Sequence, residues 1–201
     1  FVATAVHELK TPLTAIKGAI EVLEQGAVDD PVARPRFLGN IRIEAERMIR
    51  MVGELNELSK LDVEIPDSQK EPVDYGACVR DIVERLRPTF DPPHAELQLN
   101  LPETRLPARV MTGRIEQVLA NLLDNAFRYT PPDGRVTVSV AVAADGSIET
   151  RVADTGCGIA PANLGKVFDR FFTTEPKGVA RDYGSGLGLA VARSIVESHR
   201  G

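Results

Sequence analysis

The sequence predicts a chain in two parts, a helical hairpin followed by an α+β domain with helices over one face of a mixed sheet. Three observations indicate this division. Apolar residues recur at helical spacing through residues 1–64, a polar segment bracketed by prolines follows at 65–72, and helical and alternating patterns mix thereafter. Hydrophobic residues make up 43% of the 201 residues, enough for a core, and without Trp that core must be mostly aliphatic.

Residues 1–64 contain two amphipathic stretches separated by Gly26 and Pro31, a glycine suited to end one helix and a proline suited to begin the next. In each stretch apolar residues lie three or four positions apart, as on one stripe of a helix. These are Val2, Ala5, Leu9, Leu13, Ile16, Ile20 and Leu23, and then Leu38, Ile41, Ala45, Met48, Val52 and Leu55. Two helices cannot enclose a core, so we expect two copies of the hairpin to form a four-helix bundle.

Residues 73–201 alternate between helical and strand patterns. We expect helices over 75–87, 113–129 and 186–199, a strand over 96–101, and paired strands over 135–143 and 147–153 around an Asp145-Gly146 turn. Residues 155–186 are rich in Gly, Pro and charged residues, which predicts a long loop. Helices combined with hairpin-linked strands favour the α+β class.

Charge and composition exclude several functions. The net charge of −5, from 24 basic and 29 acidic residues, gives no general attraction to nucleic acid or to an anionic membrane. The longest apolar run, residues 136–144, has nine residues, whereas a membrane span needs about 20. Cys78 and Cys157 match no metal-site spacing, and we expect both to be reduced. The chain begins at Phe1 within a helical pattern, and we expect it to be part of a longer protein.

His7 lies off the apolar stripe of the first helix, on the face that it shares with Thr11, so we expect its imidazole to be exposed. Glu8 follows it directly. A carboxylate beside a histidine can hold the proton of one ring nitrogen and leave the other as a nucleophile. Pro12 removes the N–H that would bond to the carbonyl of Glu8, which should bend the helix after His7. The alternative is an ordinary surface histidine.

The helix expected over 113–129 carries Asn121, Asn125 and Arg128 on one polar line. Amide oxygens can ligate a hard cation such as Mg²⁺, and an arginine can bind phosphate. The alternative is that the two asparagines satisfy each other inside a core.

Two glycine-containing segments follow. In residues 154–158, glycines let a flat ligand approach the backbone, and Asp154 can accept a hydrogen bond from an amine such as that of adenine. Residues 184–189 open the last helix, where free N–H groups and the helix dipole favour an anion. Each segment also fits an ordinary turn, and the second lacks the lysine of a P-loop.

Together and in this order, the four motifs resemble those of sensor histidine kinases of two-component signalling, over nearly all of the chain. They read His-Glu-Leu-Lys-Thr-Pro-Leu at 7–13, Asn-Leu-Leu-Asp-Asn-Ala at 121–126, Asp-Thr-Gly-Cys-Gly at 154–158, and Gly-Ser-Gly-Leu-Gly-Leu at 184–189. The resemblance implies a dimerisation and phosphotransfer hairpin (1–64), a linker (65–72) and an α+β sandwich of the Bergerat, gyrase-like ATP-binding type (73–201). In the family one or two closing strands follow the last helix, so we expect the sequence to stop short of them.

The resemblance also implies a role for each matching residue. His7 would accept the phosphoryl group, and Glu8 would orient or deprotonate His7. Thr11 would place water for dephosphorylation of the partner. Asn125 would ligate Mg²⁺, and Asp154 would bind the adenine amine. The full set expected at ATP is Asn121, Asn125, Arg128, Tyr129, Asp154, Gly156, Gly158, Arg170, Gly184, Gly186, Leu187 and Gly188.

The sequence departs from the family pattern in places. Val6 stands where a serine is usual, and Lys10 replaces a common arginine. Thr173 occupies a position where many relatives have a basic residue that reaches the γ-phosphate. Arg170, Lys177 and Arg181 are the possible substitutes, and the sequence does not choose among them.

The activity implied is transfer of the γ-phosphoryl group of Mg-ATP to His7 and then to an aspartate of a response-regulator receiver domain, together with phosphatase action on that partner. The same resemblance implies a parent protein anchored in a bacterial membrane, with this part on the cytoplasmic side. Two alternatives stay open. An ATPase or serine kinase of the same fold would have a glutamate at position 121 as the general base for water or a hydroxyl. The amide of Asn121 cannot take that proton. A scaffold without turnover is compatible with Thr173 and the missing strands.

Overall fold

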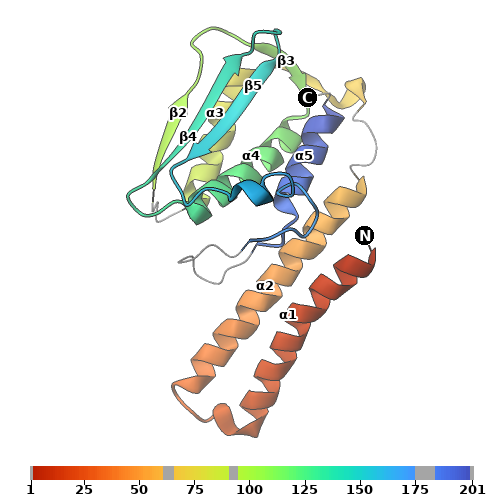
Figure 1. The fold of residues 1–201 in the computed structure, drawn as a ribbon, viewed down its shortest axis with the longest axis vertical. Coiled ribbons are helices and arrows are strands. Elements are labelled where there is room, and N and C mark those ends of the chain that lie inside the picture. Colours follow the sequence, from red (N-terminus) through yellow and green to blue (C-terminus); the bar gives the residue numbers. More distant parts are fainter. Residues whose placement is uncertain (1, 61–65, 91–94, 175–183, 200–201) are drawn as a thin grey trace.

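A computed structural model describes residues 2–60, 66–90, 95–174 and 184–199 of the chain. A long helical hairpin extends from one end of an α+β region, and the N-terminus lies at the end of the hairpin near that region (Figure 1).

The hairpin consists of α1 (Val2–Val22), a short π-helical turn (Leu23–Ala27) and α2 (Ala33–Lys60). Gly26 adopts a φ of 111°, which ends the first helix as its position predicted. Asp30 caps the second, because its Oδ1 accepts the N–H groups of Val32 at 2.7 Å and Ala33 at 3.0 Å. These backbone bonds hold the pKa of Asp30 below its usual value.

The α+β region contains two small sheets. In one, β1 (Glu71–Asp74) pairs antiparallel with β3 (Pro107–Val110). In the other, β4 (Arg135–Val142) lies between β2 (Glu96–Asn100), which is parallel to it, and β5 (Ile148–Asp154), which is antiparallel. The helices are α3 (Tyr75–Leu86), α4 (Thr112–Tyr129) and α5 (Gly188–Ser198). Single 3-10 turns occur at Asp67–Gln69, Arg87–Phe90 and Pro161–Asn163.

One core lies between the three-stranded sheet and two helices. Val136, Val138 and Val140 alternate along β4 toward one face and are buried there. They meet fully buried side chains of α4, such as Leu119 and Leu123, and a matching row on α3. The helices therefore cover one face of a mixed sheet, as the sequence predicted (Figure 1).

The expected helices and the β4–β5 hairpin are confirmed to within about two residues, but β1 and β3 were not predicted. The segment expected to be a linker ends inside β1, at Glu71 and Pro72. These strands have four residues each and carry proline and charge, so the sequence shows no clear strand pattern, although Ala108 and Val110 of β3 alternate toward the core. Hydrogen bonds position them instead: Asp74 Oδ1 accepts the Leu106 N–H at 3.1 Å, and the Leu106 carbonyl accepts the Tyr75 N–H at 2.8 Å.

A second core joins the hairpin to the α+β region. Met51 and Leu58 of α2 are almost fully buried against Leu187, Val191 and Ile195, at the beginning of α5 and along it. Val118 of α4 and Ala192 of α5 complete the buried set, and Leu9 of α1 packs against it. An ion pair between Glu57 of α2 and Arg114 of α4 lies beside it. We call this contact between α2 and the α4–α5 pair the docked arrangement.

Candidate functional site

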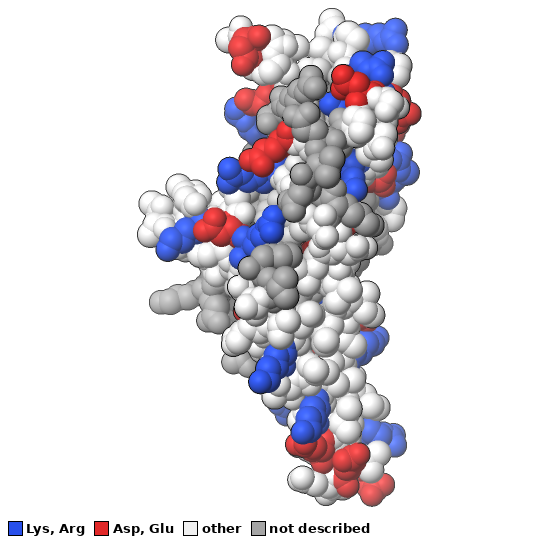
Figure 2. Space-filling view, turned by 90° about the vertical axis from the view of Figure 1, so that its right-hand side faces the viewer, with Lys and Arg blue, Asp and Glu red and all other residues white. Residues whose placement is uncertain are grey.

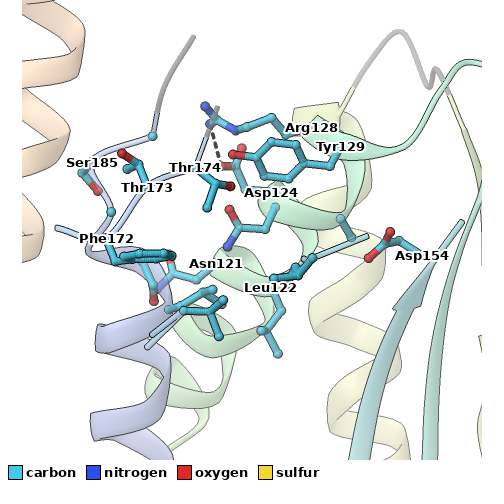
Figure 3. Close-up of a pocket in the computed structure, with 18 of the residues that line it drawn as sticks. Asn121, Leu122, Asp124, Arg128, Tyr129, Asp154, Phe172, Thr173, Thr174 and Ser185 are labelled. Carbon is cyan, nitrogen blue, oxygen red and sulfur yellow. Dashed lines mark hydrogen bonds and ion pairs between the residues drawn. The ribbon is translucent and has the colours of Figure 1, made fainter. Parts of the chain in front are cut away.

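A cavity of about 290 Å³ lies between α4, the end of β5, the glycine segment 184–188 and α2 (Figure 3). Its size is near the lower end of the roughly 300–1,000 Å³ typical of small-ligand pockets. Residues from segments far apart in the sequence line it, namely Arg50, Glu54, Asn121, Leu122, Asp124, Asn125, Ala126, Arg128, Tyr129, Val152, Asp154, Cys157, Gly158, Ile159, Val167, Phe172, Thr173, Thr174, Gly184, Ser185, Gly186, Gly188 and Leu189.

Helix α4 supplies one wall. The polar line of Asn121, Asn125 and Arg128 faces the cavity, on the side opposite the apolar face that packs on the sheet. The amide nitrogen of Asn121 donates to the carbonyl of Gly188 at 3.0 Å, so this asparagine ties α4 to the start of α5. Arg128 bonds to Asp124 at 2.8 Å, one helical turn away (Figure 3). The interpretation of Asn121 as one half of an Asn–Asn core pair is therefore wrong.

The end of β5 forms the opposite side of the cavity. Asp154 is the last residue of the strand, and its Oδ1 accepts the Gly156 N–H at 2.8 Å. No second partner of this carboxylate is found among the described residues, so its other oxygen can accept a bond from a ligand. Gly156 is not part of the cavity lining, and a Cβ there would overlap the carbonyl oxygen of Tyr129, so the backbone packs closely at this point. The wall at this point consists of backbone, with the exposed Cys157 on its surface.

The glycine segment brings bare backbone to the cavity in front of α5. Gly186 has a φ of 71°, and its carbonyl accepts the N–H of Phe171 at 2.8 Å. A Cβ on Gly186 would lie 2.6 Å from the Phe171 carbonyl carbon, so only glycine fits there. Helix α5 begins at Gly188, where the free N–H groups of its first turn lie beside the cavity and favour an anion.

Besides Gly156, two further residues expected at ATP do not line the cavity, Leu187 and Arg170. The side chain of Leu187 is fully buried in the core that joins the hairpin to the α+β region, because the chain turns there to enter α5. Arg170 is exposed on the loop before Phe171 and is absent from the cavity lining. The other candidates for a basic residue at the γ-phosphate, Lys177 and Arg181, lie outside the described residues.

His7 lies on α1, away from the cavity lining, and its side chain is 79% exposed, as its position off the apolar stripe predicted. The Oε1 atom of Glu8 is 3.6 Å from its Nδ1 atom. The ring nitrogen on the other side of the imidazole is therefore the one that faces away from the carboxylate. Thr11, one turn along the helix, is also exposed.

Two charged residues of the cavity, Arg50 and Glu54, come from α2 and were not predicted. Nothing in the local sequence marks them, since they resemble the other charged residues of an amphipathic helix. Ser185 forms a side-chain hydrogen bond with Glu54, and burial raises the pKa of this carboxyl. Asp124, also missed, lies inside the Asn121–Ala126 motif and could have been found there.

Comparison with known proteins assigns this architecture. The model of the His Kinase A (phospho-acceptor) domain matches residues 1–64, and that of the histidine kinase-, DNA gyrase B-, and HSP90-like ATPase matches residues 112–201. The sensor histidine kinase WalK of Bacillus subtilis is 37% identical to this chain over 202 aligned positions that include all of it. The chain belongs to the sensor histidine kinase family.

Solved structures of histidine kinases resemble this chain in fold. The histidine kinase AdeS of Acinetobacter baumannii is 28% identical, with a TM-score of 0.64 over 96% of this chain and 86% of its own. The histidine kinase ThkA, in complex with the response regulator protein TrrA, matches with a TM-score of 0.75 over the whole chain and 55% of its own, and at 21% identity this likeness concerns the fold alone. This sensor histidine kinase chain spans about a third of the length of WalK, 33%. Among the parts described, no helix has the length and hydrophobicity of a membrane span.

Proposed function

We propose that this chain is the catalytic core of a histidine kinase that phosphorylates His7 with Mg-ATP. One observation carries the proposal: the cavity gathers three of the four motifs around one space, while the fourth presents an exposed histidine on a separate helix. A phosphoryl donor site and a phosphoryl acceptor on different bodies are what such a transfer needs.

ATP would bind with its adenine at the Asp154 end and its phosphates at the glycine segment. The free oxygen of the Asp154 carboxylate suits the adenine amine, and Gly156 lets the backbone behind this carboxylate pack closely against the carbonyl of Tyr129. At the other end, the N–H groups of α5 and the guanidinium of Arg128 suit the phosphates.

Asn125 is the proposed Mg²⁺ ligand. A single amide oxygen fits this role because Mg²⁺ keeps most of its waters and is held largely by the phosphates of the nucleotide. When bound, the ion would neutralise charge that develops on the phosphates during transfer. Asn121 supports this wall through its bond to Gly188 rather than through a ligand of its own.

His7 would attack through Nε2. Glu8 lies on the Nδ1 side, so it can hold the proton of Nδ1 and leave the lone pair of Nε2 free. A bond forms between Nε2 and the γ-phosphorus while the bond from that phosphorus to the β,γ-bridging oxygen breaks, and ADP leaves. The phosphoryl group would then pass to an aspartate of a receiver domain. The histidine kinase ThkA, which resembles this chain in fold, has been solved in complex with the response regulator protein TrrA. Thr11, exposed one turn from His7, is proposed to place water when the same helix dephosphorylates that partner.

We also propose that the hairpin dimerises. Val6, Leu13 and Ile20, seven residues apart on α1, are 60%, 55% and 42% exposed, and Leu38 and Val52 of α2 are each 53% exposed. Figure 2 shows one side of the hairpin, where scattered basic side chains lie on a mostly uncharged surface above a charged tip. Pairing with a second copy would cover these side chains and give the four-helix bundle that the hairpin lacks alone. The domain limits 1–64, 65–72 and 73–201 stay proposals, as does a place on the cytoplasmic side of a bacterial membrane.

The test is labelling with γ-labelled ATP and Mg²⁺, followed by acid or alkali treatment. We expect label that is lost in acid, stable in alkali and absent from His7→Gln. His94→Gln, a change at another of the three histidines, is the matched control and should keep the label. Acid-stable label would point to a hydroxyl acceptor and contradict the proposal. Bound nucleotide without label would favour an ATPase or scaffold, although the amide of Asn121 already disfavours hydrolysis because it cannot act as a base.

A further inference from the structure

The hairpin contributes two charged residues to the proposed nucleotide cavity, Arg50 and the carboxylate Glu54. Helix α2 is held against the α4–α5 pair by buried Met51 and Leu58 and by the Glu57–Arg114 ion pair. This docked arrangement places Arg50 and Glu54 in the cavity lining, among residues that otherwise come from the α+β region. The shape and charge of the cavity therefore depend on whether α2 is docked.

Glu54 lies at the end of the cavity proposed for the phosphates. Its carboxylate accepts a hydrogen bond from the hydroxyl of Ser185, in the middle of the glycine segment. In Figure 3, Ser185 and Asp154 lie on opposite sides of the view, so the glycine segment and the proposed adenine end are apart. The charged groups that act on Glu54 are Arg50 on its own helix and Asp124 and Arg128 on α4.

The environment of Glu54 disfavours the binding of another anion beside its carboxylate. Its Oε2 atom is buried and has no hydrogen-bond partner among the described residues. Arg50 and Arg128 both favour the charged form of Glu54, but Asp124 acts against it, and Arg128 is shared with Asp124 through a 2.8 Å bond. Burial also raises the pKa of this carboxyl, which reflects how weakly its charge is stabilised. A further negative charge at this end would be repelled at short range in a medium of reduced dielectric constant.

We propose that Glu54 makes the docked arrangement select against the γ-phosphate, so that ADP fits beside it and ATP does not. This rests on the proposed function, because it assumes nucleotide in this cavity. ATP binding and docking of α2 then oppose each other, and ATP releases the α+β region from the hairpin. Release is what the region needs to approach a histidine that lies outside the cavity lining. After transfer, ADP lets α2 dock again.

The experiment compares the affinities of the 201-residue chain for Mg-ADP and for a Mg-bound non-hydrolysable ATP analogue, by calorimetry. Glu54→Gln should tighten binding of the analogue about tenfold, or ~1.4 kcal/mol, and leave the ADP affinity within about twofold. Glu46→Gln removes the same charge from an exposed position on the same helix and should change neither affinity. An unchanged ratio in Glu54→Gln overturns the inference. Weaker binding of the analogue overturns it too, since Glu54 would then be helping to hold the metal.

A second measurement needs no variant. Amide hydrogen exchange in residues 51–58 of the native chain should become faster with the ATP analogue and stay slow with ADP. Equal exchange with the two nucleotides overturns the inference. If neither nucleotide binds the native chain, the proposed function fails and this inference fails with it. If both bind and the ratio of their affinities is the same in the native chain and in every variant, only this inference is overturned.

Discussion

Replacement of Gly156 by alanine should weaken ATP binding strongly while leaving the fold intact. A Cβ at this position would lie 2.8 Å from Asp154 Oδ1 and 2.9 Å from the carbonyl carbon of Tyr129, and closer still to the carbonyl oxygen. Ordinary contacts begin at 3.4 Å. The carboxylate proposed for adenine and the backbone beside it must therefore move apart.

The magnitude follows from that displacement. The carboxylate contact alone is about 0.6 Å too short, and the overlap with the Tyr129 carbonyl is larger, so a shift approaching 1 Å is needed. Misplacement of a site by about 1 Å can cost about 100-fold, which corresponds to ~2.8 kcal/mol. We expect the dissociation constant of an ATP analogue to rise by about that factor.

Calorimetric titration measures the effect, and Gly165→Ala is the matched control because nothing lies within 4 Å of a Cβ at that glycine. Far-UV circular dichroism and thermal unfolding establish that both variants are folded. If folded Gly156→Ala binds the analogue within about threefold of the native chain, the assignment of the adenine end to Asp154 is refuted.

Three further predictions concern the contact between the two parts of the chain and its cavity. Glu57→Gln should remove the ion pair with half-buried Arg114 and speed amide hydrogen exchange in α2. Unchanged exchange in this variant would contradict the docked arrangement. Iodoacetamide should modify exposed Cys157 first and more slowly when an ATP analogue is bound, whereas Cys78, whose pKa is raised by burial, should react slowly with or without it. Because the pKa of Glu54 is raised in the docked arrangement, docking takes up a proton. Docking should therefore be strongest below the ordinary pKa of 4.5 and weaken as the pH rises through the raised pKa. Amide exchange in α2 measured against pH should show this dependence, and Glu54→Gln should flatten it.

Much of the fold could be predicted from local patterns. The apolar face of α4 and the alternation around Gly146 reflect burial against one neighbour, which a single segment records in its own sequence. The stripes of α1 and α2 predicted two helices in the same way, although several of their residues are exposed in the structure. Strands β1 and β3 have only four residues each, too few for a pattern that the sequence alone would reveal. Their position depends on Asp74 and on pairing between segments more than 30 residues apart, as the register of Glu71 with Val110 shows.

The candidate site divides in the same way. Asn125, Asp154 and Gly186 belong to motifs whose chemistry is local, and all three line the cavity. Glu54 and Arg50 line it only because α2 docks on α5, a tertiary contact that no spacing within the hairpin encodes. Leu187 shows the converse, since a residue inside a nucleotide motif is fully buried in the core that joins the hairpin to the α+β region.

The docked arrangement also limits how freely the two parts of such a kinase can be exchanged. Met51 and Leu58 fit a surface built by Val191 and Ile195, with almost no exposed area left on any of the four. A substitution on one side leaves a void or an overlap on the other, so these positions should vary together among relatives. A chimaera that joins this hairpin to a foreign α+β region would keep both parts and lose the fitted contact between them, unless the half of α2 that carries Met51 and Leu58 is transferred together with its own α5.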